Sequence, residues 1–220
     1  MPLLLLALLW FLGLFILVGV LLLPFHFTVY SIYHLLTVPF QLLKVASNPR
    51  LRSNHSLEHA TMNVLEEKFG PQKTSGMARE DGFIVQGSFS PATVEICARE
   101  GLARLKNGEA QLRIHRRCGT SILASNLLAS IIFIFLLWYF QVFSLMNILL
   151  AIGIAYLVGP YLGRILQATI TTSTRVGTLE IMGLELARQP GFLGMLRGSG
   201  KYIVRTTSLS PSVATARRLP

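Results

Sequence analysis

Two long segments of the chain contain no charged residue, and this feature constrains the fold more than any other. Residues 1–43 and 118–163 lack Asp, Glu, Lys and Arg, although the whole chain of 220 residues carries 20 basic and 10 acidic residues. A helix needs about 20 apolar residues to cross a bilayer, so each segment has room for two such helices. A soluble single domain and a disordered chain are both excluded. We therefore expect an α-helical multi-pass membrane protein.

The first segment predicts an N-terminal membrane anchor over residues 1–46. Residues 2–23 are almost entirely apolar and end at Pro24. No basic residue precedes this run and no small-residue cleavage site follows it closely, so we interpret it as a retained anchor and not as a signal peptide. Residues 25–43 are less apolar and predict either a second short span or a helix lying in the membrane interface. The anchor therefore has one or two helices.

The second segment predicts a transmembrane helical hairpin over residues 118–166. Its helices fall at about 121–141 and 144–166, and the turn between them is uncharged. Trp138 and Tyr139 lie near that turn, where aromatic side chains favour the headgroup layer. With the anchor, the chain has three or four predicted membrane helices.

The charges that flank these helices predict the orientation of the chain. Residues 44–117 contain 12 basic and 8 acidic residues, and residues 164–220 contain 8 basic and 2 acidic ones. The positive-inside rule places both segments in the cytoplasm. The net charge of +10 favours contact with anionic lipid headgroups. No nucleic-acid recognition motif accompanies it, so no nucleic acid is an expected partner.

A small cytoplasmic α+β domain is predicted between the two membrane segments, over residues 47–117. Its pattern indicates a helix over 49–70 with Asn48 as N-cap, a strand or hairpin over 74–86, a helix over 91–106, and a strand over 110–114. A unit of this length is near the lower size limit for an independent hydrophobic core. We therefore expect it to pack against the membrane helices or against a partner. Residues 167–220 are interpreted as a basic cytoplasmic tail in which 202–204 favours a strand.

One cluster of residues has the composition of a metal site: His55-Ser56-Leu57-Glu58-His59. Residues four apart share one face of a helix, so both imidazoles can point at one metal ion. Glu58 is close enough to reach a water bound to that ion. Zinc with three protein ligands keeps one position open and lowers the pKa of bound water to about 7, and a carboxylate can then accept its proton. The alternative is a polar helix start whose side chains are solvated near the membrane surface.

A third ligand is expected where the second uncharged segment begins. His115 and Cys118 are both ligands that zinc accepts. The predicted strand turns His115 away from its own buried side, although His115 can still face the helix of residues 49–70. An alternative for His115 and the two arginines after it is a role as interfacial anchors. Three weaker ligand candidates are Glu95, Glu100 and Glu109.

The motif residues resemble two known groups of proteins. Ser53 to Thr61, followed by Asn107-Gly108-Glu109 and by His115-x-x-Cys118-Gly119-Thr120 before a membrane hairpin, resembles an uncharacterised family of bacterial membrane proteins of the photosynthetic type. That resemblance covers roughly residues 50–200 and implies an inner or thylakoid-type membrane. The order H-x-x-E-H resembles the inverzincin peptidases, which implies that His55 and His59 bind zinc and that Glu58 is the general base. Those enzymes have much larger catalytic domains and a distant glutamate ligand without a counterpart here.

Two functions follow as hypotheses. The first is a membrane-embedded, zinc-dependent, peptidase-like hydrolase at the cytoplasmic membrane face, with His55, His59 and one of His115 or Cys118 as ligands and Glu58 as the catalytic base. The second is a non-enzymatic auxiliary subunit or assembly factor of a larger membrane complex. In that case a site closed by all four ligands would support folding.

Overall fold

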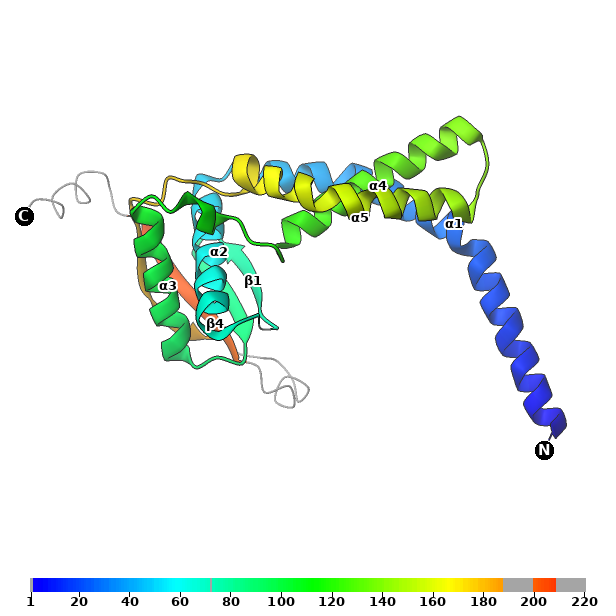
Figure 1. The fold of residues 1–220 in the computed structure, drawn as a ribbon, viewed down its shortest axis with the longest axis horizontal. Coiled ribbons are helices and arrows are strands. Elements are labelled where there is room, and N and C mark those ends of the chain that lie inside the picture. Colours follow the sequence, from blue (N-terminus) through cyan, green and yellow to red (C-terminus); the bar gives the residue numbers. More distant parts are fainter. Residues whose placement is uncertain (1, 72, 188–199, 209–220) are drawn as a thin grey trace, which may run out of the picture. The chain divides into compact units, whose positions relative to one another are not determined.

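A computed structural model describes residues 2–71, 73–187 and 200–208 of the chain (Figure 1). It divides into two compact units. The first comprises residues 1–40 and 122–162, and the second comprises residues 41–121 and 163–220. The parts of the predicted tail at 188–199 and 209–220 lie outside the described residues.

Three helices among the described residues are long and apolar enough to cross a membrane. They are α1 (Pro2–Ala46), α4 (Gly119–Phe140) and α5 (Leu145–Leu166), which continues into the five-residue π-helix η2 (Gln167–Thr171). The predicted hairpin of two helices is thus confirmed as α4 and α5. In the first unit, Phe27 of α1 contacts Phe133 of α4 edge to face, with ring centroids 4.8 Å apart. Phe133 packs in turn with Ile148 and Ala151 of α5.

Of the one or two helices predicted for the anchor, the structure has one, because α1 runs without a break through Pro24. A proline inside a helix removes one backbone hydrogen bond and bends the axis. Ending the helix there would leave several backbone groups unpaired among apolar side chains, which costs more. The ribbon of α1 accordingly changes direction partway along its length (Figure 1).

The second unit is built on a four-stranded antiparallel sheet with the strand order β1-β2-β4-β3. Its strands are β1 (Ser75–Arg79), β2 (Gly82–Gly87), β3 (Leu179–Leu186) and β4 (Gly200–Ser208). The hairpin expected at 74–86 and the strand expected at 202–204 are both confirmed. Two of the four strands come from residues after the membrane-type hairpin, so the domain predicted at 47–117 is incomplete without them.

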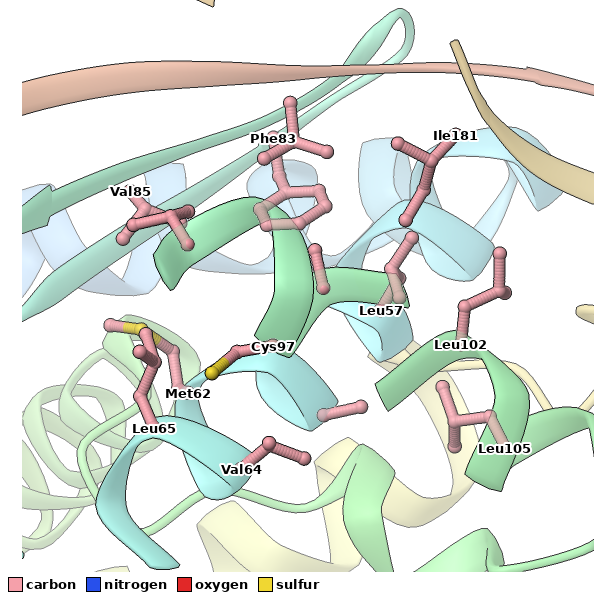
Figure 2. Close-up of a cluster of buried hydrophobic side chains, with 14 of the residues drawn as sticks. Leu57, Met62, Val64, Leu65, Phe83, Val85, Cys97, Leu102, Leu105 and Ile181 are labelled. Carbon is pink, nitrogen blue, oxygen red and sulfur yellow. The ribbon is translucent and has the colours of Figure 1, made fainter. Parts of the chain in front are cut away.

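Two helices cover one face of this sheet: α2 (Pro49–Phe69) and α3 (Pro91–Lys106). Both start as the sequence predicts, with Asn48 and Ser90 accepting backbone N–H groups as N-caps. Their apolar sides meet inward-facing strand residues such as Phe83, Val85 and Ile181 in one core (Figure 2). Cys97 belongs to this core. The core fixes α2 against the sheet, and α2 carries the H-x-x-E-H sequence.

The strand expected over residues 110–114 is wrong, since Ala110–Arg113 forms the 3₁₀ helix η1. The alternation of apolar and polar residues is real, and Leu112 is buried. The carbonyl groups of Leu112 and Ile114 accept hydrogen bonds from the side-chain amide of Asn63 on α2. The segment is therefore held by a helix side chain, and none of the strands in the described part of the chain pairs with it.

Candidate metal centre

The first half of α2 is enclosed by other elements of the second unit. Every residue from Ser53 to Met62 is buried, which is unusual for a helix that carries two histidines and a glutamate. The sequence places polar side chains on all sides of this stretch, so each of them has to find a partner inside the protein. The contacts of these side chains define the site.

Three side chains converge beside α2. His55, His59 and Cys118 each offer one ligand atom, and these three atoms all lie within 4.8 Å of one another. All three residues are buried. The convergence is the one expected of two imidazoles four residues apart on a helix, joined by the cysteine that precedes α4. Of the two candidates for a third ligand, the structure brings Cys118 to this cluster.

Backbone carbonyl groups orient both imidazoles. His55 Nδ1 lies 2.9 Å from the carbonyl oxygen of Thr171, and His59 Nδ1 lies 2.6 Å from that of Arg113. A carbonyl oxygen can only accept, so each Nδ1 donates a proton to its carbonyl and leaves Nε2 facing the cluster. Metal-ligating histidines are typically held in this way by a second group. These two carbonyls were not predicted, since nothing in a sequence marks a backbone oxygen.

His59 Nε2 is the clearest sign that the cluster needs an additional atom. It is buried and has no hydrogen-bond partner among the described residues. Burial, the nearby His55 and the nearby His115 hold the pKa of His59 well below its usual value, although the bond to Arg113 opposes the shift. The imidazole is therefore neutral, which is the form that binds a metal ion.

Cys118 lies beside His55 and at the start of α4. Its sulfur lies 3.4 Å from His55 Nε2 and accepts the backbone N–H of Thr120, also at 3.4 Å. Cys118 directly precedes α4, so its sulfur lies at the positive end of a helix of 22 residues. A cysteine sulfur is a ligand that zinc accepts.

Glu58 lies beside the three-residue cluster without belonging to it. Burial raises the pKa of its carboxyl group from 4.5 to about 7; His55 opposes this shift, Cys118 adds to it, and a hydrogen bond from the backbone of Ala78 opposes it. Strand β1 approaches closely here because residue 76 is glycine. A Cβ added at Gly76 would lie 2.8 Å from Glu58 Cγ and closer still to the carboxylate. Glycine thus makes room for the acid.

The raised pKa of Glu58 predicts how the metal-free protein responds to pH. Because the folded state holds this proton more tightly, it binds more protons than the unfolded state between pH 4.5 and pH 7. The contribution of Glu58 to the free energy of unfolding therefore falls as pH rises through this range, by about 3 kcal/mol in total. The depressed pKa of His59 acts in the opposite direction.

Comparison with Glu58→Gln isolates this contribution. Chemical unfolding in detergent, with a chelator present, should show the wild type losing stability relative to the variant between pH 4.5 and pH 7. Parallel pH profiles for the two proteins would contradict the buried, protonatable state of Glu58.

His115 is buried beside the cluster but is not one of its three members. Its ring centroid lies 5.9 Å from that of His59, and its Nε2 lies 3.3 Å from Glu66 Oε1. His115 was predicted to point away from the buried side of a strand over residues 110–114. Because that strand does not form, this prediction is wrong. The weaker candidates Glu95, Glu100 and Glu109 pair with Arg99, Lys68 and Arg104, respectively.

The segment after α5 is fastened along α2 by hydrogen bonds. Arg52 donates to the carbonyl groups of Thr169 and Thr172, and Ser56 Oγ donates to the carbonyl of Ser173 at 2.7 Å. This attachment carries the Thr171 carbonyl to His55. Residues 167–173 were expected to begin a basic tail, and a run of Thr and Ser gives no signal of this role.

The comparisons with known proteins identify relatives without an assigned activity. The model of a domain of unknown function, DUF6391, matches residues 50–184, which include all the residues of the cluster. An uncharacterized protein of Picosynechococcus sp. is 30% identical over 135 residues. That alignment covers 56% of this chain and 66% of the relative, so the chain spans just under two thirds of that relative's length. No solved structure matches. The expected resemblance to an uncharacterised family is confirmed, while none of these relatives is described as a peptidase.

Proposed function

The chain belongs to the DUF6391 family, and we propose that it is a membrane-embedded, zinc-dependent, peptidase-like hydrolase. The observation that carries this proposal is the convergence of His55, His59 and Cys118 ligand atoms within 4.8 Å, all of them buried. The proposed zinc ligands are His55 Nε2, His59 Nε2 and Cys118 Sγ. Glu58 is the proposed general base.

The donor set favours zinc over other common metal ions. Two imidazoles and a thiolate are ligands that zinc takes at about 2.0–2.3 Å, whereas calcium and magnesium prefer oxygen. The unpartnered Nε2 of buried His59 supports a bound ion, because an orphaned polar atom at that depth is costly. Three protein ligands leave one position of a tetrahedral site for water or substrate, which is the arrangement of catalytic zinc.

The chemistry assigned to Glu58 follows from its position and its pKa. Zinc held by His55, His59 and Cys118 would supply a water of lowered pKa and would polarise a substrate carbonyl group. Glu58 would accept a proton from the attacking water as the water oxygen bonds to the carbonyl carbon. Glu58 then returns the proton to the nitrogen that leaves when the C–N bond breaks. In the metal-free protein burial raises the pKa of this carboxyl group to about 7, and a bound cation would favour its charged, proton-accepting form.

The proposed location is an inner or thylakoid-type membrane with the second unit on the cytoplasmic side. Three helices with the length and composition of membrane spans support insertion. The sidedness rests on the basic residues that flank those helices, which would also meet anionic lipid headgroups. Cys118 directly precedes one such helix and Thr171 ends another, so the site is built from residues at the helix ends.

Metal analysis and a hydrolysis assay on the purified full chain test the proposal in two steps. We expect about one zinc per chain, because three ligands form one site, and cleavage of unstructured peptides that a chelator stops and added zinc restores. A zinc content that is negligible in the wild type and the same in His55→Ala would refute the site. Bound zinc without chelator-sensitive hydrolysis would refute the enzyme and leave the metal site.

The geometry around Gly76 predicts a variant that separates metal binding from catalysis. Gly76→Ala should displace the Glu58 carboxylate, because the new methyl group occupies its place. Hydrolysis should fall about 100-fold, as expected for a misplacement of about 1 Å, with unchanged zinc content. Gly153→Ala is the matched control, since a Cβ there meets nothing within 4 Å. Equal activity in both variants would contradict the role given to Glu58.

A second candidate is an auxiliary subunit or assembly factor whose metal site is structural. It is favoured by the exposure of α1, on which the large apolar side chains from Leu3 to Leu23 are all at least 38% exposed and available to lipid or to the helices of other subunits. Extraction in mild detergent followed by size analysis tests it. Migration as a monomer would count against a subunit, and co-migration with other membrane proteins would support it.

A further inference from the structure

Gln167 is a buried glutamine that bridges the two sides of the Cys118 segment. It is the first residue of η2, and its side chain is completely buried. Its Oε1 accepts the backbone N–H of His115 at 2.9 Å, and its Nε2 donates to Ser121 Oγ at 2.7 Å. These partners lie three residues before and three residues after Cys118. One amide group therefore fixes the chain on both sides of the cysteine.

The Cys118 segment needs such a support because it lacks regular structure. The residues between η1 and α4 belong to no helix or strand. A cysteine in an irregular connection holds its sulfur in place only if the backbone on both sides is fixed. Gln167 holds the backbone N–H of His115 on one side, and on the other side it holds the hydroxyl of Ser121 in the first turn of α4.

A close approach of two helices brings Gln167 within reach of Ser121. A Cβ added at Gly163, one turn before Gln167, would lie 2.6 Å from Ser121 Cβ. Glycine at 163 thus allows α5 to pass directly against the start of α4. The next turn of the same chain places the amide of Gln167 on the Ser121 hydroxyl.

The same short π-helix also orients a second member of the cluster. Thr171, the last residue of η2, accepts the Nδ1 proton of His55 through its carbonyl oxygen. The wider turn of a π-helix is frequent at functional sites. Here its first residue acts on Cys118 and its last residue acts on His55, so η2 contributes to the placement of two of the three ligands.

We infer that Gln167 is a positioning residue of the metal centre, which holds Cys118 Sγ where the two imidazoles can share an ion with it. The inference rests on the proposed metal site and does not depend on hydrolysis. Without the amide bridge, His55 and His59 still face each other on α2, but the sulfur loses its fixed distance from them. The expected consequence is a loss of metal affinity of about 10- to 100-fold, the usual effect of removing a group that orients a ligand.

Cobalt(II), which occupies zinc sites and reports thiolate ligation through its charge-transfer absorption, is the probe. The full chain in detergent is titrated as wild type, Gln167→Met, Gln167→Glu and Gln111→Met. Methionine keeps the length of the side chain and makes neither hydrogen bond. Glutamate can accept from both His115 N–H and the Ser121 hydroxyl, so it should restore the bridge. Gln111 is exposed on η1 and serves as the matched control.

We expect a cobalt–thiolate band in the wild type, in Gln111→Met and in Gln167→Glu. In Gln167→Met the band should weaken, and cobalt should bind about 10- to 100-fold more weakly. A purely structural glutamine would lower the unfolding temperature without changing the band of the protein that remains folded. Wild-type affinity and an unchanged band in Gln167→Met would overturn the inference, and so would the absence of a thiolate band in the wild type.

Two further results keep the inference separate from protein folding and from catalysis. If Gln167→Met does not fold, Ser121→Ala is measured in its place. This variant removes one of the two hydrogen bonds of Gln167 at a half-buried position, and the cobalt–thiolate band is again the readout. An unchanged band and affinity in Ser121→Ala would then overturn the inference. A wild-type protein that gives the thiolate band but hydrolyses nothing would refute the proposed hydrolase and leave the role of Gln167 intact.

Discussion

Replacing His59 with alanine is expected to abolish the stabilisation of the protein by zinc. His59 is buried, its Nδ1 is held by the Arg113 carbonyl, and its Nε2 has no partner among the described residues. Removing a ligand should weaken binding by more than the roughly 10- to 100-fold that follows loss of an orienting group. Zinc at about 1,000 times its dissociation constant adds about 4 kcal/mol to the wild type, which raises the unfolding temperature by on the order of 10 °C.

Thermal unfolding in detergent, with zinc or with a chelator, measures this effect. His26→Ala is the matched control, because His26 is an exposed histidine on α1 and lies in the other unit. Its zinc-dependent shift should equal that of the wild type. A full shift in His59→Ala, or no shift in the wild type, would rule out the proposed ligand set.

Replacing Glu58 with glutamine is expected to leave zinc bound and to remove hydrolysis. Glutamine has nearly the shape of the acid, so it fits against Gly76, but it cannot accept a proton. Loss of a general base costs about 10²- to 10⁴-fold in the turnover rate. Because Glu58 stands outside the three-atom cluster, metal content should stay at the wild-type level. Peptide hydrolysis and zinc analysis on the same preparation measure both quantities.

Glu95→Gln provides the control for this change. Glu95 pairs with Arg99 on the surface of α3, away from the buried cluster, so its loss should alter neither quantity. Loss of zinc from Glu58→Gln would indicate that Glu58 is a ligand and favour a closed, structural site. Undiminished hydrolysis in Glu58→Gln would exclude it as the base.

The sequence predicted most of the local elements of this fold, although not the 3₁₀ helix η1 or the unbroken helix α1. Helix α2 follows from Asn48, Pro49 and the helical spacing of its apolar residues, and α4 and α5 follow from a charge-free segment of the right length. These signals lie within about 20 residues of one another, the length of one membrane helix. The pairing of His55 with His59 is also a local prediction, since helix geometry alone places both residues on one face.

Long-range contacts account for what the sequence did not provide. The sequence could not decide whether His115 or Cys118 is the third ligand, because the choice depends on how the chain beyond η1 packs against α2. The Thr171 carbonyl lies 116 residues from His55 along the chain, and the residue pattern around one of them does not predict contact with the other. Strand pairing of 82–87 with 200–205 is equally remote. Such contacts are properties of the packed core and have no local signature.

The position of β4 inside the sheet has a consequence for how the protein is made. β4 lies between β2 and β3, yet it is the last of the four strands to leave the ribosome. β2 therefore remains without its inner neighbour while both helices of the hairpin are synthesised. Cys118 precedes these helices, but η2 and the strands that complete the core are synthesised only after them. Synthesis thus delays the completed metal centre until the hairpin exists, and a chain halted before η2 would lack the Thr171 carbonyl that orients His55.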